Sequence, residues 1–370
     1  MPCISFAPSR RRCISLAFSL AFSLALPGAL SACAGLPDHD RAPRLLDAHV
    51  PADYNGVVLL RAGRSAAPVV KTWGQARFDT PGAIAADTRF MVGSVSKWIT
   101  AVAVLRLVEQ GKLDLDKPVT AWLPELPAAS RAVTLRHLLS NTSGIERGLT
   151  LALKRDPAVE RLTIPAREAA LRFGAGPLLF APGTRFDYSS TNWVIVAGIV
   201  ERATGEPFTR TVTRLVLEPA GAFETGFASL DPAGMPRLAL AYGSERTARK
   251  MPAAPPLAAA AGTIYSTARD LVKIADLVYG ERLLSAASRR ELMTVQHAPE
   301  EYALGGRVKQ LRNGPGMRTL AWESGVMGGY KTLLAYAPED GRTVVLLNNT
   351  DMAQSEQARI ALALLEALDK

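Results

Sequence analysis

Strand-like segments lie near both ends of the 370-residue chain, and this separation constrains the fold more than any other sequence feature. Near the start, residues 55–60 and 68–74 are rich in β-branched residues and flank a polar turn, which predicts a hairpin. Near the end, residues 331–336 and 343–347 predict two further strands, followed by a closing helix. Residues 112–235 carry helix and loop signals with many prolines and glycines. We therefore expect an α/β unit that is interrupted by a helical insertion.

Cysteine and histidine are too scarce to build most metal or disulfide sites. The three cysteines, Cys3, Cys13 and Cys33, all lie in the first tenth of the chain. The remaining residues therefore form no disulfide, thiolate metal site or cysteine nucleophile. Only four histidines are present, and one of them, His39, precedes the expected folded domain, so a multi-histidine metal site is not expected. Neither a metal nor an organic cofactor is implied.

The charge distribution does not indicate a nucleic-acid partner. The formal net charge of +9 arises from 43 basic and 34 acidic residues, with no Lys/Arg block beyond the N-terminal segment. A scattered surplus of this kind is weak evidence for any particular partner. The apolar share of 48% and the charged share of 21% are those of a globular protein, which excludes intrinsic disorder.

The N-terminal segment has the layout of a secretory leader. Residues 10–12 are three arginines, and residues 14–26 form an uncharged apolar run that is short for a membrane-spanning helix. Residues 30–33 (LSAC) then resemble a bacterial lipobox, in which the cysteine becomes acylated. Because Cys33 lies at the end of the apolar run, we expect it to be the lipidated residue; the alternative is a signal peptide with an incidental cysteine.

This interpretation divides the chain into three parts. We expect a lipoprotein signal peptide over residues 1–32, a lipid-anchored tether over residues 33–44, and a folded domain over residues 45–370 whose helical insertion spans roughly residues 112–235. Several acyl chains on one cysteine would hold the protein stably on a membrane. Ala34 follows the cysteine rather than aspartate, which favours the outer membrane, facing the periplasm, in a Gram-negative cell.

The most apolar predicted helix begins at Ser94. An extended segment over residues 89–93 precedes it, and apolar residues then recur at spacings of three and four until Gly111. Ser94 and Lys97 share one face of this helix, so the lysine can act as base or proton relay for the hydroxyl. The helix N-terminus also favours negative charge developing at the serine. The chain contains no Gly-x-Ser-x-Gly elbow, the alternative setting for a nucleophilic serine.

The surroundings of this motif resemble a known family. Residues 90–97 (FMVGSVSK) are similar to the nucleophile segment of class C β-lactamases and their penicillin-binding-protein-like relatives. Four more segments resemble landmarks of that family in the same order, over about residues 45–365 in total: residues 111–119, 133–145, 181–190 and 262–271. The resemblance implies an antiparallel sheet flanked by helices, with an inserted all-helical subdomain and the site between them.

The same resemblance implies an acyl-enzyme mechanism. Ser94 would attack a carbonyl carbon, and Lys97 and Tyr188 would share the proton transfers. The third motif of the family corresponds to residues 322–326, where the backbone N–H groups of Ser94 and Val326 would form the oxyanion hole. Further substrate-binding candidates in this motif are Glu323, Ser324 and Gly325.

Two positions depart from the family pattern. The asparagine of the Tyr-x-Asn segment is Ser190 here, and Asn192 is the candidate replacement. The lysine or histidine that opens the third motif is Glu323. In β-lactamases and DD-peptidases this region helps to hold the substrate carboxylate, which an acid within about 4 Å would repel. We therefore expect a carboxylesterase or amidase-like preference, unless Arg307, Lys309 or Lys331 compensates.

Two alternatives stay open. Within the same class, the chain is a D-alanyl-D-alanine carboxypeptidase or weak β-lactamase that acts on cell-wall peptides or β-lactams. In a different class, it is a penicillin-binding sensor that keeps the fold without turnover. In each case the expected partners are a small-molecule or peptide substrate and a membrane reached through Cys33, with no nucleic acid, and the expected state is a monomer.

Overall fold

The computed structural model describes residues 38–80, 82–313 and 316–369. The expected signal peptide, Cys33 and the first part of the expected tether lie outside these residues. None of the described helices is both long enough and apolar enough to cross a membrane.

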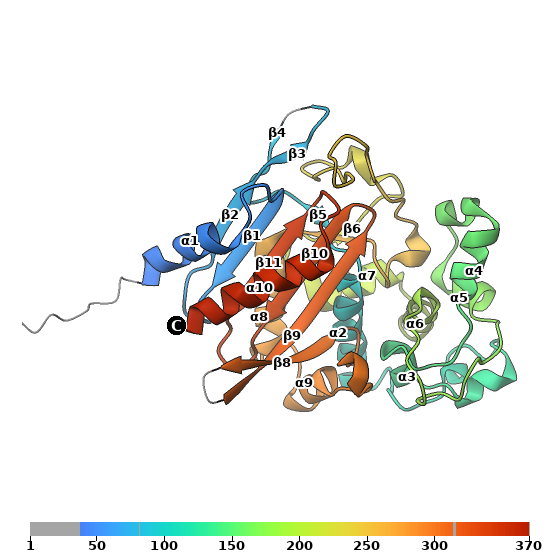
Figure 1. The fold of residues 1–370 in the computed structure, drawn as a ribbon. Coiled ribbons are helices and arrows are strands. Elements are labelled where there is room, and N and C mark those ends of the chain that lie inside the picture. Colours follow the sequence, from blue (N-terminus) through green and yellow to red (C-terminus); the bar gives the residue numbers. More distant parts are fainter. Residues whose placement is uncertain (1–37, 81, 314–315, 370) are drawn as a thin grey trace, which may run out of the picture. The chain divides into compact units, whose positions relative to one another are not determined.

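A six-stranded antiparallel sheet forms the centre of the fold (Figure 1). Its strand order is β2-β1-β11-β10-β9-β8, so the first hairpin of the chain pairs directly with the last strand. The strand segments predicted near the two ends of the chain thus belong to one sheet. Its strands are β1 Gly56–Arg61, β2 Val69–Trp73, β8 Arg307–Asn313, β9 Gly316–Met327, β10 Tyr330–Tyr336 and β11 Thr343–Asn348.

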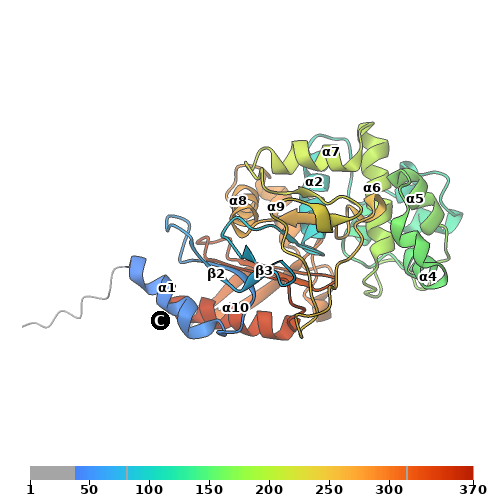
Figure 2. The ribbon, with the colours of Figure 1, turned by 90° about the horizontal axis from the view of Figure 1, so that it is seen from above.

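Helices cover both faces of this sheet (Figures 1 and 2). In β1, Val57 and Leu59 join the core cluster that contains α2 and α8, whereas Val58 and Leu60 join the cluster that contains α1 and α10. Because both faces are buried, the central strands are continuous apolar runs rather than alternating ones. The four helices are α1 Asp38–His49, α2 Val95–Glu109, α8 Ala268–Tyr279 and α10 Gln354–Asp369.

A group of helices lies beside the sheet and forms most of the stretch that the sequence predicts as an insertion. Its central member, α6, packs against α3, α4, α5 and α7, and residues Thr191 to Val200 of α6 are all buried. This explains why α6 is apolar on nearly every side. The group consists of α3 Leu135–Leu139, α4 Gly148–Arg155, α5 Ala166–Phe173, α6 Ser190–Thr204 and α7 Phe208–Val212.

Short elements complete the fold and connect the chain to α2. Strand β5 pairs with β7, and β7 pairs with β6, which fixes the extended segment just before Ser94. The remaining strands and the remaining α-helix are β3 Gln75–Arg77, β4 Gly82–Ala83, β5 Phe90–Met91, β6 Gly226–Phe227, β7 Ile264–Ser266 and α9 Ala286–Met293.

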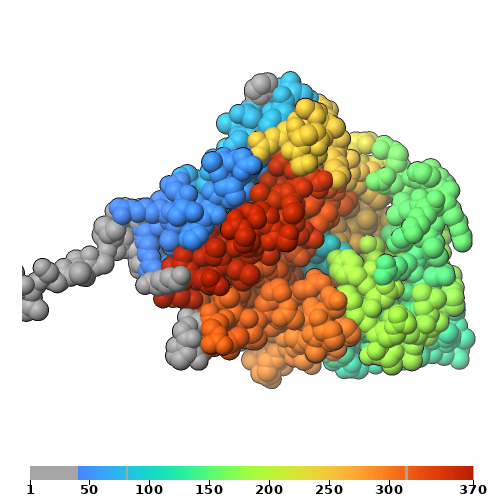
Figure 3. Space-filling view, viewed as in Figure 1, coloured from blue at the N-terminus to red at the C-terminus, as the bar shows by residue number. Residues whose placement is uncertain are grey.

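The N-terminal boundary of the folded part differs from the expected one. Residues 38–44, expected to be tether, form the first turns of α1, and Ala42 and Leu46 are buried against α10 and the sheet. The Arg41 guanidinium also donates a hydrogen bond of 2.8 Å to the Ala367 carbonyl. Pro43 lies within the helix, where burial of its apolar neighbours outweighs the helix-breaking tendency of proline. Residues 38–44 therefore belong to α1, which packs beside α10 (Figure 3), rather than to a tether.

Candidate active site

Ser94 lies at the point where the chain turns from β5 into α2. The turn passes through Gly93, whose φ of +52° is a backbone conformation that favours glycine. A side chain at Gly93 would also collide with the backbone of Val326. Ser94 occupies the N-cap position of α2, yet its hydroxyl makes no capping hydrogen bond. Its Oγ is thus left for other partners.

Lys97 follows one helical turn later and points back to the serine. Its Nζ donates hydrogen bonds to Ser94 Oγ at 3.2 Å and to the Ala261 carbonyl at 2.6 Å, and the residue is 2% exposed. Nζ also lies 5.0 Å from the ring centroid of Tyr188. Both hydrogen-bond acceptors are neutral oxygens, and among the described residues no carboxylate forms an ion pair with Lys97. The amine is therefore held against the serine rather than against an acid.

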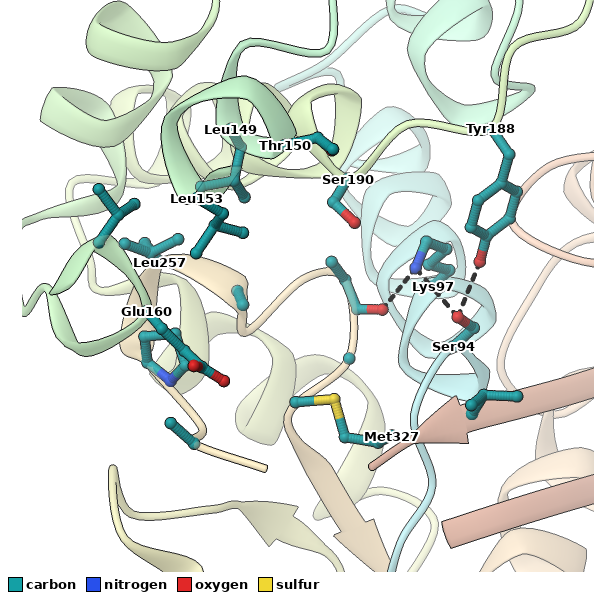
Figure 4. A pocket seen from close by; sticks show the side chains of 17 residues that line it. Ser94, Lys97, Leu149, Thr150, Leu153, Glu160, Tyr188, Ser190, Leu257 and Met327 are labelled. Carbon is teal, nitrogen blue, oxygen red and sulfur yellow. Dashed lines mark hydrogen bonds between the residues drawn. The ribbon is translucent and has the colours of Figure 1, made fainter. Parts of the chain in front are cut away.

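Tyr188 completes the polar group from a third part of the chain. It precedes α6, and its hydroxyl donates a hydrogen bond of 2.7 Å to Ser94 Oγ (Figure 4). The structure thus brings together Ser94, Lys97 and Tyr188, as the sequence predicts, although 94 residues separate the tyrosine from the serine. A hydroxyl that contacts both an amine and a phenol can exchange its proton with either.

The third motif lies on β9 and runs directly past the start of α2. A Cβ on Gly325 would collide with the Val92 carbonyl and would lie 3.2 Å from the Ser94 nitrogen, so only glycine permits this approach. Val326, next along the strand, is 42% exposed and lines the cavity in front of Ser94. Among the described residues no acceptor is bonded to the Ser94 N–H. The Val326 backbone nitrogen lies beside Gly93 on the same turn. That the N–H groups of Ser94 and Val326 form the oxyanion hole stays a prediction.

Glu323 is buried rather than exposed in the cleft. It is 4% exposed and forms no hydrogen bond or ion pair with any other described residue. Burial raises the pKa of its carboxyl to about 8, against a smaller lowering by the Arg307 guanidinium. Glu323 is therefore mostly uncharged at neutral pH, and the charge repulsion expected from the sequence operates only above about pH 8. At neutral pH the difference from the family pattern is a missing cation.

None of the three candidate cations takes the place of the missing charge. Arg307 pairs with Glu300 at 3.1 Å, and Lys309 pairs with Glu301 at 2.6 Å. Lys331 pairs with Asp351. Each of these side chains is held by an acid of its own, so the site presents no unpaired cation in place of the family's lysine or histidine.

The two amide-replacement candidates have different positions. Ser190 lines the cavity in front of Ser94 (Figure 4). Asn192 does not line it: its side chain is 1% exposed, accepts a hydrogen bond from Ser143 at 2.7 Å and donates one to Asn141 at 3.2 Å. The expectation that Asn192 replaces the family asparagine is therefore wrong, because residues two apart on a helix point to different sides.

A cavity of about 250 Å³ opens from Ser94 toward α4 and the helical group (Figure 4). Its walls are mainly apolar, with leucines from α4 and from the loop before β7, and a carboxylate stands near its far end. The apolar side chains are Leu149, Leu153, Leu257 and Met327, and the carboxylate is that of Glu160. Such a cavity accommodates a short aliphatic or aromatic group next to the serine.

Sequence reasoning missed three contributors to the site. The Ala261 carbonyl that holds Lys97 is a backbone group, which no side-chain motif reveals. The leucines of the large cavity lie on α4 and in the loop before β7, outside the segments that carry the family resemblance. Tyr302 lines a second, smaller cavity beside Ser94, and only its position three residues before a pair of glycines could have drawn attention to it. No cluster of His, Cys, Asp or Glu suited to a metal ion occurs among residues 38–369 outside the two short gaps.

Comparisons with known proteins identify a matching family, similar sequences and similar structures. The sequence model of the family described as Beta-lactamase matches residues 50–368. Esterase EstB of Burkholderia gladioli is 41% identical over 160 residues, which cover 40% of this chain and 40% of EstB. The putative penicillin-binding protein PbpX of Bacillus subtilis is 29% identical over 276 residues, which cover 72% of this chain and 64% of PbpX. The match thus spans less than two thirds of either relative.

A solved structure extends the comparison to the fold. The D-stereospecific amidohydrolase from a Streptomyces species superimposes with a TM-score of 0.71 at 26% identity. The superposition covers 88% of this chain and 98% of the amidohydrolase. The mixed arrangement of antiparallel sheet and helices is thus the one expected from the resemblance.

Proposed function

The chain belongs to the beta-lactamase family of serine hydrolases, and on this premise we propose that it hydrolyses carboxylic esters or amides through an acyl-enzyme on Ser94. The observation that carries the proposal is the pair of hydrogen bonds to Ser94 Oγ, from Tyr188 at 2.7 Å and from Lys97 at 3.2 Å. A serine oxygen that contacts two proton-exchanging groups at a helix N-terminus can act as a nucleophile toward a carbonyl carbon.

Acylation begins when Ser94 Oγ attacks the carbonyl carbon of the substrate. The hydroxyl proton passes to the Lys97–Tyr188 pair, and the negative charge on the carbonyl oxygen is met by the N–H groups of Ser94 and Val326. The bond to the leaving group then breaks, and the pair returns the proton to the departing alcohol or amine. An ester between Ser94 and the acyl group remains.

Deacylation repeats these steps with water as the nucleophile. The water gives its proton to the same pair, the tetrahedral intermediate is held by the same two N–H groups, and Ser94 recovers its proton as the carboxylic acid leaves. Because Lys97 hydrogen-bonds to the fixed Ala261 carbonyl, the amine stays in place through both half-reactions.

The substrate class follows from the charge and shape of the cavity. An apolar space of about 250 Å³ favours a short acyl or alkyl group. Arg307 and Lys309 are each held by an acid and leave no cation for a substrate carboxylate. Uncharged esters and amides are therefore the preferred substrates, in keeping with the names of the esterase and amidohydrolase relatives. D-alanyl-D-alanine cleavage and weak β-lactamase activity are the alternative, which the penicillin-binding-protein name of PbpX favours.

Turnover of matched substrates by the purified chain tests the proposal. We expect the kcat/KM for p-nitrophenyl butyrate to exceed that for nitrocefin and for an acylated D-alanyl-D-alanine peptide by at least tenfold. Equal turnover of nitrocefin and the ester would contradict the substrate class. Ser94→Ala should abolish every hydrolysis, by a factor of roughly 10³ or more, whereas Ser65→Ala in an exposed turn should not.

A probe of the serine separates this enzyme from a penicillin-binding sensor. A fluorophosphonate should add one adduct to the wild-type chain, seen by intact mass, and none to Ser94→Ala. With butyrate ester, an enzyme gives sustained turnover after any burst. A burst of one equivalent followed by no further product would identify the sensor.

Cell-envelope attachment is a separate part of the proposal. We infer a lipid anchor on Cys33 and a position on the membrane that faces the periplasm, on the basis of the lipobox-like residues 30–33. Labelling of the expressed protein with an alkyne fatty acid should be lost in Cys33→Ala. The expected monomer is likewise a prediction, which light scattering after size-exclusion chromatography tests.

A further inference from the structure

A second, much smaller cavity also reaches the catalytic serine. Its volume is about 10 Å³, and it is lined by Ser94, Tyr188, Tyr302, Arg307 and Glu323 together with two glycines. A space of this size holds one water molecule, provided that two to four polar groups are present to bind it. Five oxygen-bearing side chains line this one, because Ser324 borders it as well.

Two of the lining groups have no hydrogen-bond partner of their own. The Tyr302 hydroxyl is fully enclosed and makes no hydrogen bond of good geometry, although the Asn141 side chain lies close to it. Glu323 is 4% exposed and, among the described residues, has neither a hydrogen bond nor an ion pair. Buried polar groups in native proteins are nearly always satisfied by protein or by ordered water. An enclosed hydroxyl without a well-placed partner and a carboxyl that no described residue binds both border this water-sized space, and a resident water would satisfy both.

The backbone is shaped to admit the Glu323 carboxyl. A Cβ on Gly306 would collide with both oxygens of that carboxyl. Its neighbour Gly305 has a φ of +82° and approaches the Lys97 carbonyl closely, so it too excludes a side chain. The two glycines thus make room for a buried acid next to the start of α2.

We propose that one water occupies this cavity, bridging Glu323 and Tyr302 to the Ser94–Tyr188 pair, and that Glu323 is a positioning residue whose protonated form is required for hydrolysis. The inference rests on the proposed function of Ser94 as the nucleophile. In its protonated form Glu323 can donate a hydrogen bond to the water and adds no charge to the site. When the proton is lost to bulk solvent, a carboxylate remains beside the attacking oxygen.

The charge of this carboxylate opposes the reaction. Attack of Ser94 on a carbonyl produces an oxyanion, and a second negative charge lining the same cavity raises its energy. The ionisable groups that face Glu323 are Arg307 on β8, Tyr302 before β8, Tyr188 before α6 and Tyr279 on α8, with Lys97 beside Ser94 on α2. Arg307 is the main cation among them, and it pairs with Glu300. The burial that raises the pKa of Glu323 to about 8 places the loss of activity in an accessible pH range.

The pH dependence of kcat/KM for p-nitrophenyl butyrate tests the proposal in the full chain. The wild type should lose activity with a midpoint near pH 8. Glu323→Gln keeps the shape and stays neutral, so it should not show this alkaline decline. The ratio of its kcat/KM at pH 9 to its kcat/KM at pH 7 should be at least five times the same ratio for the wild type. Glu366→Gln, on an exposed position of α10, should decline like the wild type. A decline that is unchanged in Glu323→Gln, or absent from the wild type, would overturn the proposal.

A second variant keeps the test decisive if Glu323→Gln does not fold. Tyr302→Phe removes one partner of the water, so the Glu323 carboxylate loses indirect stabilisation and the midpoint should move to higher pH. An unchanged midpoint in a folded Tyr302→Phe protein contradicts the proposal. A crystal structure of the wild type should show one water within hydrogen-bond distance of Tyr302 Oη and Glu323, and an empty cavity there would exclude it. Absence of ester turnover and of Ser94 labelling at every pH would instead refute the proposed function.

Discussion

Two cavities meet at Ser94 and Tyr188, and they differ in almost every property. The larger, of about 250 Å³, opens to solvent and is lined mainly by leucines and other apolar groups from the helical group and the loop before β7. The smaller, of about 10 Å³, lies toward β8 and β9 and is lined mostly by polar side chains. One is suited to the substrate and the other to a single water.

This difference in polarity indicates that the two cavities have different roles in the reaction at Ser94. Ser94 at the start of α2 and Tyr188 before α6 border both cavities and are assigned to the chemistry. The larger cavity is expected to set which acyl group is accepted, and the smaller to set the pH range of activity. Variants that affect both cavities should therefore have larger effects than variants that affect one.

Apart from Ser94 itself, the largest effect is expected for Tyr188, which also borders both cavities. In Tyr188→Phe the phenol that donates to Ser94 Oγ is lost, so kcat/KM for p-nitrophenyl butyrate should fall by about 10²- to 10⁴-fold. Stability should change little because only one half-buried hydroxyl is removed. Tyr265→Phe, whose ring lines neither cavity, is the control and should keep nearly full activity; an equal loss in both would reject the special role of Tyr188.

The next effect concerns the strand that separates the two cavities. A methyl group at Gly325 would collide with the Val92 carbonyl and push β9 away from the start of α2. Gly325→Ala should therefore lower kcat by about 10²-fold, through displacement of the expected oxyanion donor at Val326. Gly234→Ala, where a methyl group meets no atom within 4 Å, provides the matched control. Wild-type kinetics in Gly325→Ala would place the oxyanion hole elsewhere.

A moderate effect should be confined to the larger cavity. Leu153→Trp fills part of the apolar space in front of Ser94, so kcat/KM should fall about tenfold for the hexanoate ester of p-nitrophenol and little for the acetate. The pH profile should not change. Leu179→Trp alters a leucine that is 56% exposed and outside the cavity, and it should leave the chain-length preference intact. Equal losses on acetate and hexanoate would argue that this cavity does not hold the acyl chain.

The smallest effect is on stability and belongs to the smaller cavity. Because burial raises the pKa of Glu323 to about 8, the native state keeps a proton that the unfolded chain has already lost between about pH 4.5 and pH 8. The stability of the wild type therefore falls as pH rises through this range. Glu323→Gln has no buried carboxyl to ionise and does not lose stability in this way. Its Tm should therefore exceed that of the wild type by about 5 °C at pH 9 and by little at pH 5.

Calorimetry of both proteins across this pH range measures the difference. Glu366→Gln removes an exposed carboxyl and should show no such trend. A Tm difference between Glu323→Gln and the wild type that is the same at pH 5 and pH 9 would indicate that Glu323 titrates normally and is not buried in solution.

The local features of the fold could be predicted from the sequence. The hydrophobic period that begins at Ser94 and the stop at Gly111 predict a helix that the structure has at Val95–Glu109. The strands near both ends were visible for the same reason, since continuous apolar runs with turn residues between them are local signals. The pairing of Ser94 with Lys97 needs no more than helical spacing.

The contacts across the chain could be predicted only with help from the family resemblance. Nothing local in the sequence places the Tyr188 hydroxyl on Ser94, because that contact depends on how the helical group packs against α2. The resemblance supplied Tyr188, but it also suggested Asn192, which the helix turns inward toward Asn141 and Ser143. A motif identifies residue types, whereas the direction of a side chain follows from the helix phase in the folded protein.

Sequence alone therefore determined the segments of this protein and the pair of reactive groups that one helix presents together. Packing decided the rest: that α1 docks on the sheet through Ala42 and Leu46, that Glu323 is buried and retains its proton at neutral pH, and that two cavities of opposite polarity share one serine. The physical reason is that burial and charge depend on neighbours that are distant along the chain, while helical and strand periods depend only on residues that are close together in sequence.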